Sequence, residues 1–146
     1  MSTSIFVNIA TTDLERATAF YTALGATVNP NFTDENAACL VWDENVFFMV
    51  LRRDFMATFT DKRIGDPTAE TTALVSLSRD SREAVDAAIQ AGVAAGGREL
   101  REAQDYGFMY SRDLEDADGN ELGFLWMDPK AAELGPEAFM VEQAQG

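Results

Sequence analysis

The chain has no histidine, only one cysteine and few basic residues. Without histidine, none of its 146 residues can supply the imidazole that many catalytic metal sites use, or that activates serine and cysteine nucleophiles. Cys39 alone excludes an internal disulfide and a cysteine-based zinc site, and its apolar neighbours predict a buried thiol. No apolar run approaches the ~18–20 residues that span a bilayer.

The shortage of basic residues leaves a strongly acidic chain. Its 11 Lys and Arg residues against 25 Asp and Glu residues give a formal charge of −14. This charge repels nucleic-acid phosphates and anionic membrane surfaces, so we expect neither as a partner. It favours cationic ligands, although an acidic surface also serves solubility alone. The first residues lack a basic segment followed by an apolar one, and we therefore expect a cytoplasmic protein.

The first half of the chain predicts a strand, a helix and three further strands. Residues 5–10 alternate like a half-buried strand, and Thr12 and Glu15 have the spacing of a capping box at a helix start. Apolar residues then recur at helical spacing until Gly25. Strand-like runs follow at about 26–32, 37–42 and 46–51.

The second half repeats this order. It predicts a strand at 73–77, a helix that starts near Asp80 and stops at Gly96, and strands near 98–102, 108–113 and 121–127. Asp118 and Gly119 predict a tight hairpin turn of type I′. The prediction is therefore an α+β fold of two tandem βαβββ modules. Module 1 covers about 4–52 and module 2 about 72–128; linker 53–71 contains a short covering helix, and a helical tail covers 129–146.

This duplicated pattern resembles the vicinal oxygen chelate superfamily, which includes glyoxalase I, bleomycin-resistance proteins and extradiol dioxygenases. The resemblance covers about residues 4–128. Its most specific parts are the Asp-Leu-Glu-Arg-x-x-x-Phe-Tyr-x-x-Leu-Gly run from Asp13 to Gly25, the Asp-x-Asp-Gly-Asn turn from Asp116 to Asn120, and residues 104–110. It implies that the two modules form one cup-shaped sheet around a single cavity, and that the protein is a homodimer.

Metal enzymes of that superfamily place their ligands on the first and last strands of each module. By this resemblance the equivalent positions are Phe6, Phe48, Leu74 and Gly123, none of which has a side-chain donor. A transition metal needs three or four converging N, O or S donors. We therefore expect no metal and no other cofactor. The Asp116–Asn120 turn does not continue as a calcium loop, because the sixth position is Glu121.

Strand alternation predicts which side chains line the cup. They form an apolar pocket with a few polar groups, which is typical of a small-molecule site. The predicted ligand-binding residues are Phe6, Asn8, Phe48, Arg52, Leu74, Ser76, Tyr110, Glu121 and Gly123. Each has a structural alternative: Phe6 and Phe48 can plug the vacated metal site, and Asn8 can bond to nearby backbone.

These observations predict a metal-independent small-molecule-binding protein that sequesters or carries a hydrophobic compound, for which the acidic charge favours a cationic one. The alternative is a glyoxalase-like lyase or isomerase of the same superfamily. That enzyme would use a carboxylate or tyrosine in place of a metal, with Glu121 and Tyr110 as the catalytic candidates. A third possibility is a degenerate scaffold with a filled cup.

Overall fold

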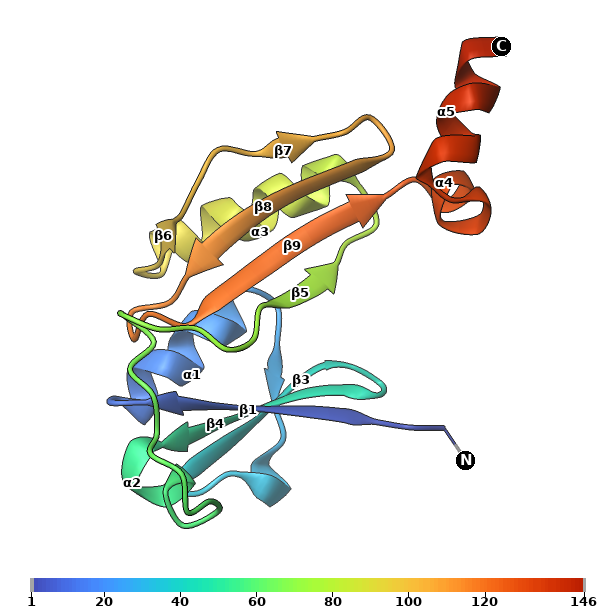
Figure 1. The fold of residues 1–146 in the computed structure, drawn as a ribbon. Coiled ribbons are helices and arrows are strands. Elements are labelled where there is room, and N and C mark those ends of the chain that lie inside the picture. Colours follow the sequence, from blue (N-terminus) through green and yellow to red (C-terminus); the bar gives the residue numbers. More distant parts are fainter. Residues whose placement is uncertain (1, 146) are drawn as a thin grey trace.

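Each half of the chain folds in the predicted order, which confirms the α+β class (Figure 1). The computed structural model describes residues 2–145. Module 1 contains β1 (Ile5–Thr11), α1 (Leu14–Ala23), β2 (Thr27–Val28), a 3-10 turn (Pro30–Phe32), β3 (Ala37–Asp43) and β4 (Val46–Arg52). Module 2 contains β5 (Val75–Ser78), α3 (Arg82–Ala94), β6 (Arg98–Glu99), β7 (Gln104–Asp105), β8 (Met109–Glu115) and β9 (Glu121–Met127).

The two sheets repeat one strand order. Sheet A runs β1-β4-β3-β2 and sheet B runs β5-β9-β8-β6, with β7 also paired to β8. In each sheet the first strand pairs in parallel with the last strand, so β1 lies beside β4 and β5 beside β9. This leaves β1 and β5 as edge strands within the described sheets, next to the boundary between the modules.

One hydrophobic core serves both modules. It joins Phe20 and Tyr21 of α1 and Phe48 of sheet A to Ile89 of α3 and Phe124 of sheet B, all of them buried. Helices α1 and α3 contact each other, so each covers part of the other module's apolar surface. The face of each sheet opposite these two helices is called the cup face below.

Helix α1 starts one residue later than the capping box predicts. Asp13 is the N-cap, and its carboxylate accepts a hydrogen bond from the Arg16 amide at 3.0 Å. Thr12 instead donates its hydroxyl to Asp118, in the turn between β8 and β9. The capping-box assignment is therefore wrong, because a contact between the modules takes the Thr12 hydroxyl. Ser81 caps α3 in the expected region.

The hairpin turn between β8 and β9 is tight but is not of type I′. Gly119 has a φ of +97°, whereas Asp118 has a negative φ, as does every other non-glycine residue that the structure describes. Type I′ needs positive φ at both central residues, so that part of the prediction is wrong. A Cβ on Gly119 would lie 2.9 Å from the Thr68 backbone nitrogen, so the turn also lies directly against the linker.

Three short helices complete the chain. The predicted helix in the linker is α2 (Arg53–Met56), which contacts β1 and β4. The tail forms α4 (Pro129–Leu134) and α5 (Pro136–Gln145), and α5 projects away from the two sheets (Figure 1). Across residues 2–145, the helices are too short or too polar to span a membrane.

Candidate functional site

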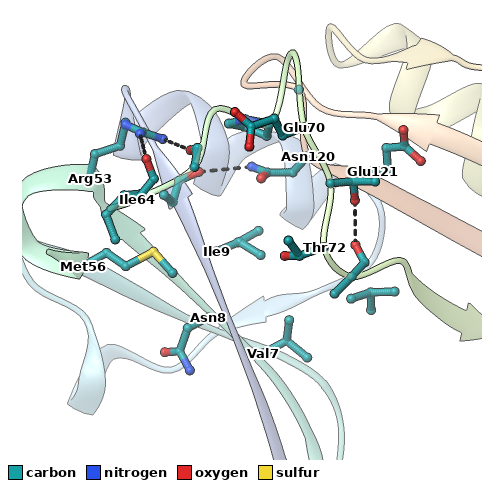
Figure 2. A pocket seen from close by; sticks show the side chains of 17 residues that line it. Val7, Asn8, Ile9, Arg53, Met56, Ile64, Glu70, Thr72, Asn120 and Glu121 are labelled. Carbon is teal, nitrogen blue, oxygen red and sulfur yellow. Dashed lines mark hydrogen bonds between the residues drawn. The ribbon is translucent and has the colours of Figure 1, made fainter. Parts of the chain in front are cut away.

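A cavity of about 240 Å³ lies at the boundary between the modules. Val7, Asn8 and Ile9 of β1 form its floor, and Asn120 and Glu121 at the start of β9 form its far wall (Figure 2). Ala10 and Val75 also line the cavity. The wall is fixed to the floor, because the Asn120 side-chain amide donates to the Ala10 carbonyl at 3.1 Å. Both modules therefore contribute to the cavity, as expected for a cup closed by two halves.

The cavity roof comes from α2 and the linker. Met56 and Ile64 supply apolar surface on one side, and residues 70–73 form the other side (Figure 2). Arg53 donates through its two Nη atoms to the carbonyls of Ile64 and Gly65, each at 3.0 Å. The Arg53 guanidinium is thus hydrogen-bonded to the backbone of the linker.

The polar groups at the cavity are mainly amides and carboxylates. Asn8 lines the cavity and donates to the Phe6 carbonyl at 3.4 Å, a long bond that leaves its oxygen available. The carboxylates of Glu70 and Glu121 each have an arginine at 3.9 Å, Arg63 and Arg101 respectively. At that distance and exposure these pairs are weak, so both carboxylates can interact with a bound group.

Carboxylates in the turn between β8 and β9 hold the modules together beside the cavity. Asp118 accepts hydrogen bonds from the Thr11 hydroxyl at 2.5 Å and from the Thr12 amide at 2.9 Å, and Arg16 pairs with it at 3.0 Å. Burial opposes ionisation of Asp118, but these donors outweigh it and hold the pKa of Asp118 below its usual range. Both oxygens of the Asp118 carboxylate already accept hydrogen bonds, so its role is structural.

Asp116 makes the second contact of this turn. It accepts the Tyr21 hydroxyl of α1 at 2.6 Å, and only 6% of its surface is exposed. Burial, and then the charge of Asp116, raise the pKa of Tyr21 well above its usual value. Tyr21 therefore stays protonated and acts as a hydrogen-bond donor across the two modules. The signature turn from Asp116 to Asn120 thus joins the two halves.

The cup face of sheet B carries Ser76, Glu121 and Gly123, as alternation predicts. Ser76 pairs with Gly123 across the β5–β9 ladder. A Cβ on Gly123 would lie 2.8 Å from the Ser76 hydroxyl and 2.9 Å from an Asp113 carboxylate oxygen. Gly123 occupies the position that, by resemblance, holds a metal ligand. There is no space for a longer side chain at this position unless Ser76 and Asp113 move.

Two predicted cup residues lie on the opposite face of their strands. Phe48 is 2% exposed and belongs to the shared core, while its neighbour Phe47 stacks on Phe6 with ring centroids 4.7 Å apart. Tyr110 points toward α3, where its hydroxyl donates to Asp86 at 2.6 Å. This bond raises the pKa of Tyr110. The prediction that Phe48 and Tyr110 line the cup was therefore wrong, because both face the helices and their sequence neighbours face the cup.

The remaining predicted residues lie on the surface. Phe6 is 55% exposed and Leu74 is 65% exposed, so Phe6 does not plug a closed cup. Arg52 is exposed and pairs with Asp54 at 3.4 Å. Of the predicted set, only Asn8 and Glu121 line the cavity. The linker residues of the roof were missed, because a loop has no alternation that assigns its side chains to a face.

No donor set for a transition metal is found among residues 2–145, where no three His, Cys, Asp or Glu side chains form a group that could hold an ion. The cavity carboxylates Glu70 and Glu121 therefore have no third partner of this kind. What the cavity offers is apolar surface, amide hydrogen bonding and negative charge at its rim.

Comparison with known proteins gives one family match and many structural matches. Residues 3–42 match the family described as bleomycin resistance protein-like N-terminal. No curated protein matches the chain. A hypothetical protein from S. aureus has 22% sequence identity and a TM-score of 0.72, with 86% of this chain and 94% of that chain covered.

Two other solved structures with the same architecture have names that state a class. A glyoxalase/bleomycin resistance protein/dioxygenase family enzyme from Burkholderia phytofirmans has 20% identity and a TM-score of 0.70, with 86% of this chain and 99% of that chain covered. Lactoylglutathione lyase from Agrobacterium tumefaciens has 15% identity and a TM-score of 0.63, with 86% and 94% covered. At these identities the structures show the fold alone. The chain therefore has the fold of the glyoxalase/bleomycin resistance/dioxygenase structures, and its residues 3–42 match the bleomycin resistance protein-like N-terminal family.

Proposed function

We propose that this protein is a metal-independent binding protein that sequesters or carries a small hydrophobic cation. The observation that supports this most directly is the cavity between the modules. Its floor and roof are largely apolar, and its flexible charged groups are the carboxylates of Glu70 and Glu121. The one arginine in its lining, Arg53, is engaged by two backbone carbonyls.

The size and charge of the cavity narrow the ligand class. A volume of about 240 Å³ lies below the ~300–1,000 Å³ that is usual for drug-sized ligands. Apolar walls provide affinity by burial, and Asn8 and the carboxylates orient the ligand. The formal charge of −14 adds a long-range attraction for cations. Compact aromatic or branched aliphatic amines fit these properties.

A thermal-shift screen tests the proposal. The probes are single-ring aromatic amines, each paired with a neutral compound of the same shape. A probe present at about 100 times its Kd stabilises the folded state by about 2.7 kcal/mol and raises Tm by about 5–10 °C. We expect the amines to bind and their neutral counterparts to bind more weakly. A screen in which no amine raises Tm would contradict the proposed function.

The carboxylates should account for that difference. We expect the double variant Glu70→Gln, Glu121→Gln to weaken amine binding about three- to ten-fold, because each rim carboxylate contributes about 0.3–0.7 kcal/mol. Isothermal titration calorimetry measures the change. The matched control is Glu44→Gln, Glu137→Gln, which removes the same charge at exposed positions outside the cavity. If both double variants lost the same amount of amine affinity, the loss would be due to net charge and not to the cavity carboxylates.

We also propose that two copies of the chain associate through the open part of the cup face of sheet A. There Phe6 and Phe47 stack at an interplanar angle of 11°, and Phe6 is 55% exposed. Aromatic side chains in such exposed clusters are typical anchors of protein interfaces.

Light scattering on a size-exclusion column tests the dimer. We expect Phe6→Ser to raise the dimer dissociation constant about 10- to 30-fold, because it removes one buried aromatic ring from each copy. Phe59→Ser is the control, since Phe59 is also exposed, at 64%, but lies in the linker. A wild-type protein that stays monomeric at all concentrations would refute this proposal.

A further inference from the structure

The linker segment 60–74 forms the roof of the cavity but has few bonds to the rest of the molecule. Its internal hydrogen bonds are local: Thr60 bonds to Lys62, Asp66 to Thr68 and to the amides of Ala69 and Glu70, and Thr71 to Ala73. Within the described part of the chain, the hydrogen bonds that join this segment to another element are the two from Arg53.

The segment also buries little apolar surface. Within residues 60–74 only Ile64 and Pro67 are partly buried, and the others are exposed. It packs against the β8–β9 turn at Gly119, where a Cβ would meet Thr68. Segments with few buried apolar contacts and few bonds to the core open at low cost in free energy. The stability of the roof therefore depends largely on one guanidinium.

Arg53 is well placed to control this roof. It begins α2, directly after β4, so its backbone is fixed by the sheet. Its planar fork reaches two successive carbonyls, those of Ile64 and Gly65. Ile64 and Gly65 both line the cavity, as does the guanidinium-bearing side chain itself (Figure 2).

We propose that Arg53 is a latch that holds segment 60–74 closed over the cavity, and that ligands enter and leave when this segment swings away. The role of the cavity in this inference rests on the proposed function, whereas the latch itself can be tested without a ligand. Arg53 acts through the roof and is therefore a positioning residue.

Limited proteolysis with trypsin tests the latch, because Lys62 and Arg63 lie next to the two carbonyls that Arg53 binds. When opening is fast, cleavage follows the population of the open segment. We expect Arg53→Ala to raise the rate of cleavage after Lys62 and Arg63 about ten-fold or more, the factor for losing two charge-assisted hydrogen bonds at a partly exposed site. Mass spectrometry identifies the first cut.

Arg52→Ala is the matched control. It removes an adjacent arginine and the same number of trypsin sites, but within residues 2–145 the Arg52 side chain pairs with the exposed Asp54 and not with the linker carbonyls. The latch predicts wild-type cleavage of the linker in this variant. Equal linker cleavage in Arg53→Ala and wild type would overturn the proposal.

If Arg53→Ala unfolds and is cleaved throughout the chain, a second variant, Arg53→Lys, tests the latch instead. Arg53→Lys keeps the charge and the stem but cannot present two parallel donors. Linker cleavage several-fold faster than in wild type supports the latch, and a wild-type rate refutes it.

A binding experiment separates the latch from the function. An amine that raises Tm in the thermal-shift screen should slow linker cleavage of the wild type and associate several-fold faster with Arg53→Lys in stopped-flow measurements. If no amine binds while Arg53 variants still speed cleavage, the proposed function fails and the latch stands. If an amine binds but all variants are cleaved and bind at wild-type rates, the latch alone fails.

Discussion

Asp116→Ala is expected to lower the free energy of unfolding by about 3–4 kcal/mol, because one buried carboxylate accepts four hydrogen bonds. One oxygen accepts the Tyr21 hydroxyl at 2.6 Å and the Asn120 amide at 3.0 Å. The other accepts the backbone amides of Asp118 and Asn120, each at 2.9 Å. Alanine leaves these donors without an acceptor in a region closed to water.

Urea denaturation followed by circular dichroism measures this loss. Asp43→Ala is the matched control, since Asp43 also lies at a β-hairpin but accepts only the amide of Glu44 and is exposed. Tyr21→Phe removes one donor from Asp116 and should cost about 1–2 kcal/mol. If Asp116→Ala and Asp43→Ala cost the same within ~0.5 kcal/mol, Asp116 would not join the modules as described.

Module 1 expressed alone, as residues 1–57, is expected to be unfolded. Its helix α1 carries Phe20 and Tyr21, which are 3% and 1% exposed in the whole chain because module 2 covers part of that surface. Without α3 and sheet B, the fragment exposes much of the core and loses the Asp116 and Asp118 contacts. A chain of about 60 residues is marginal even with a complete core.

Circular dichroism and amide NMR dispersion of the fragment measure this outcome. Adding a second fragment that contains residues 58–146 should restore native-like spectra, because the two pieces share one core. A cooperative thermal transition in residues 1–57 alone would contradict the shared-core description. The outcome therefore distinguishes two independent modules from two halves of a single folding unit.

Most elements of the fold could be predicted from the sequence because they depend on local patterns. Alternation located β1, β4, β5 and β9, and helical spacing located α1 and α3. Within β9, Trp126 alternates with the cup-face residues and packs against the core. Strand β7 and the brief β2 were less predictable, because each has two residues and depends on its neighbour for pairing.

Phe48 was assigned to the wrong face because the hairpins that precede the last strand of each module differ in length. The β3–β4 hairpin has a two-residue turn and a register shift between Val41 and Asp43, whereas five residues separate β8 from β9. The first residue of β4 therefore faces the helices, while the first residue of β9, Glu121, lies on the cup face. Periodicity fixes which residues share a face but not which face is buried.

The lining of the candidate site was predicted only in part, because half of it lies in a loop. Asn8 and Glu121 could be assigned from their strands, and both line the cavity. Arg53, Ile64 and Glu70 could not, since their positions depend on where the linker crosses the module boundary. The sequence did carry one signal for them: a connection longer than most loops, with apolar residues in it, often covers a binding site.

The last hairpins of the two modules differ in how strongly they connect the two halves. The turn from Asp116 to Asn120 is joined to module 1 by hydrogen bonds to Thr11, Thr12 and Tyr21. Next to the turn of the module 1 hairpin, the contact with module 2 is the Trp42 ring, whose centroid lies 5.7 Å from the Arg79 guanidinium. Extra residues inserted at Glu44 would leave both joints in place, whereas the same insertion at Ala117 would separate the halves. The module 1 hairpin can therefore accept a longer loop during divergence, or an engineered tag. The module 2 hairpin cannot, because its turn joins the two halves.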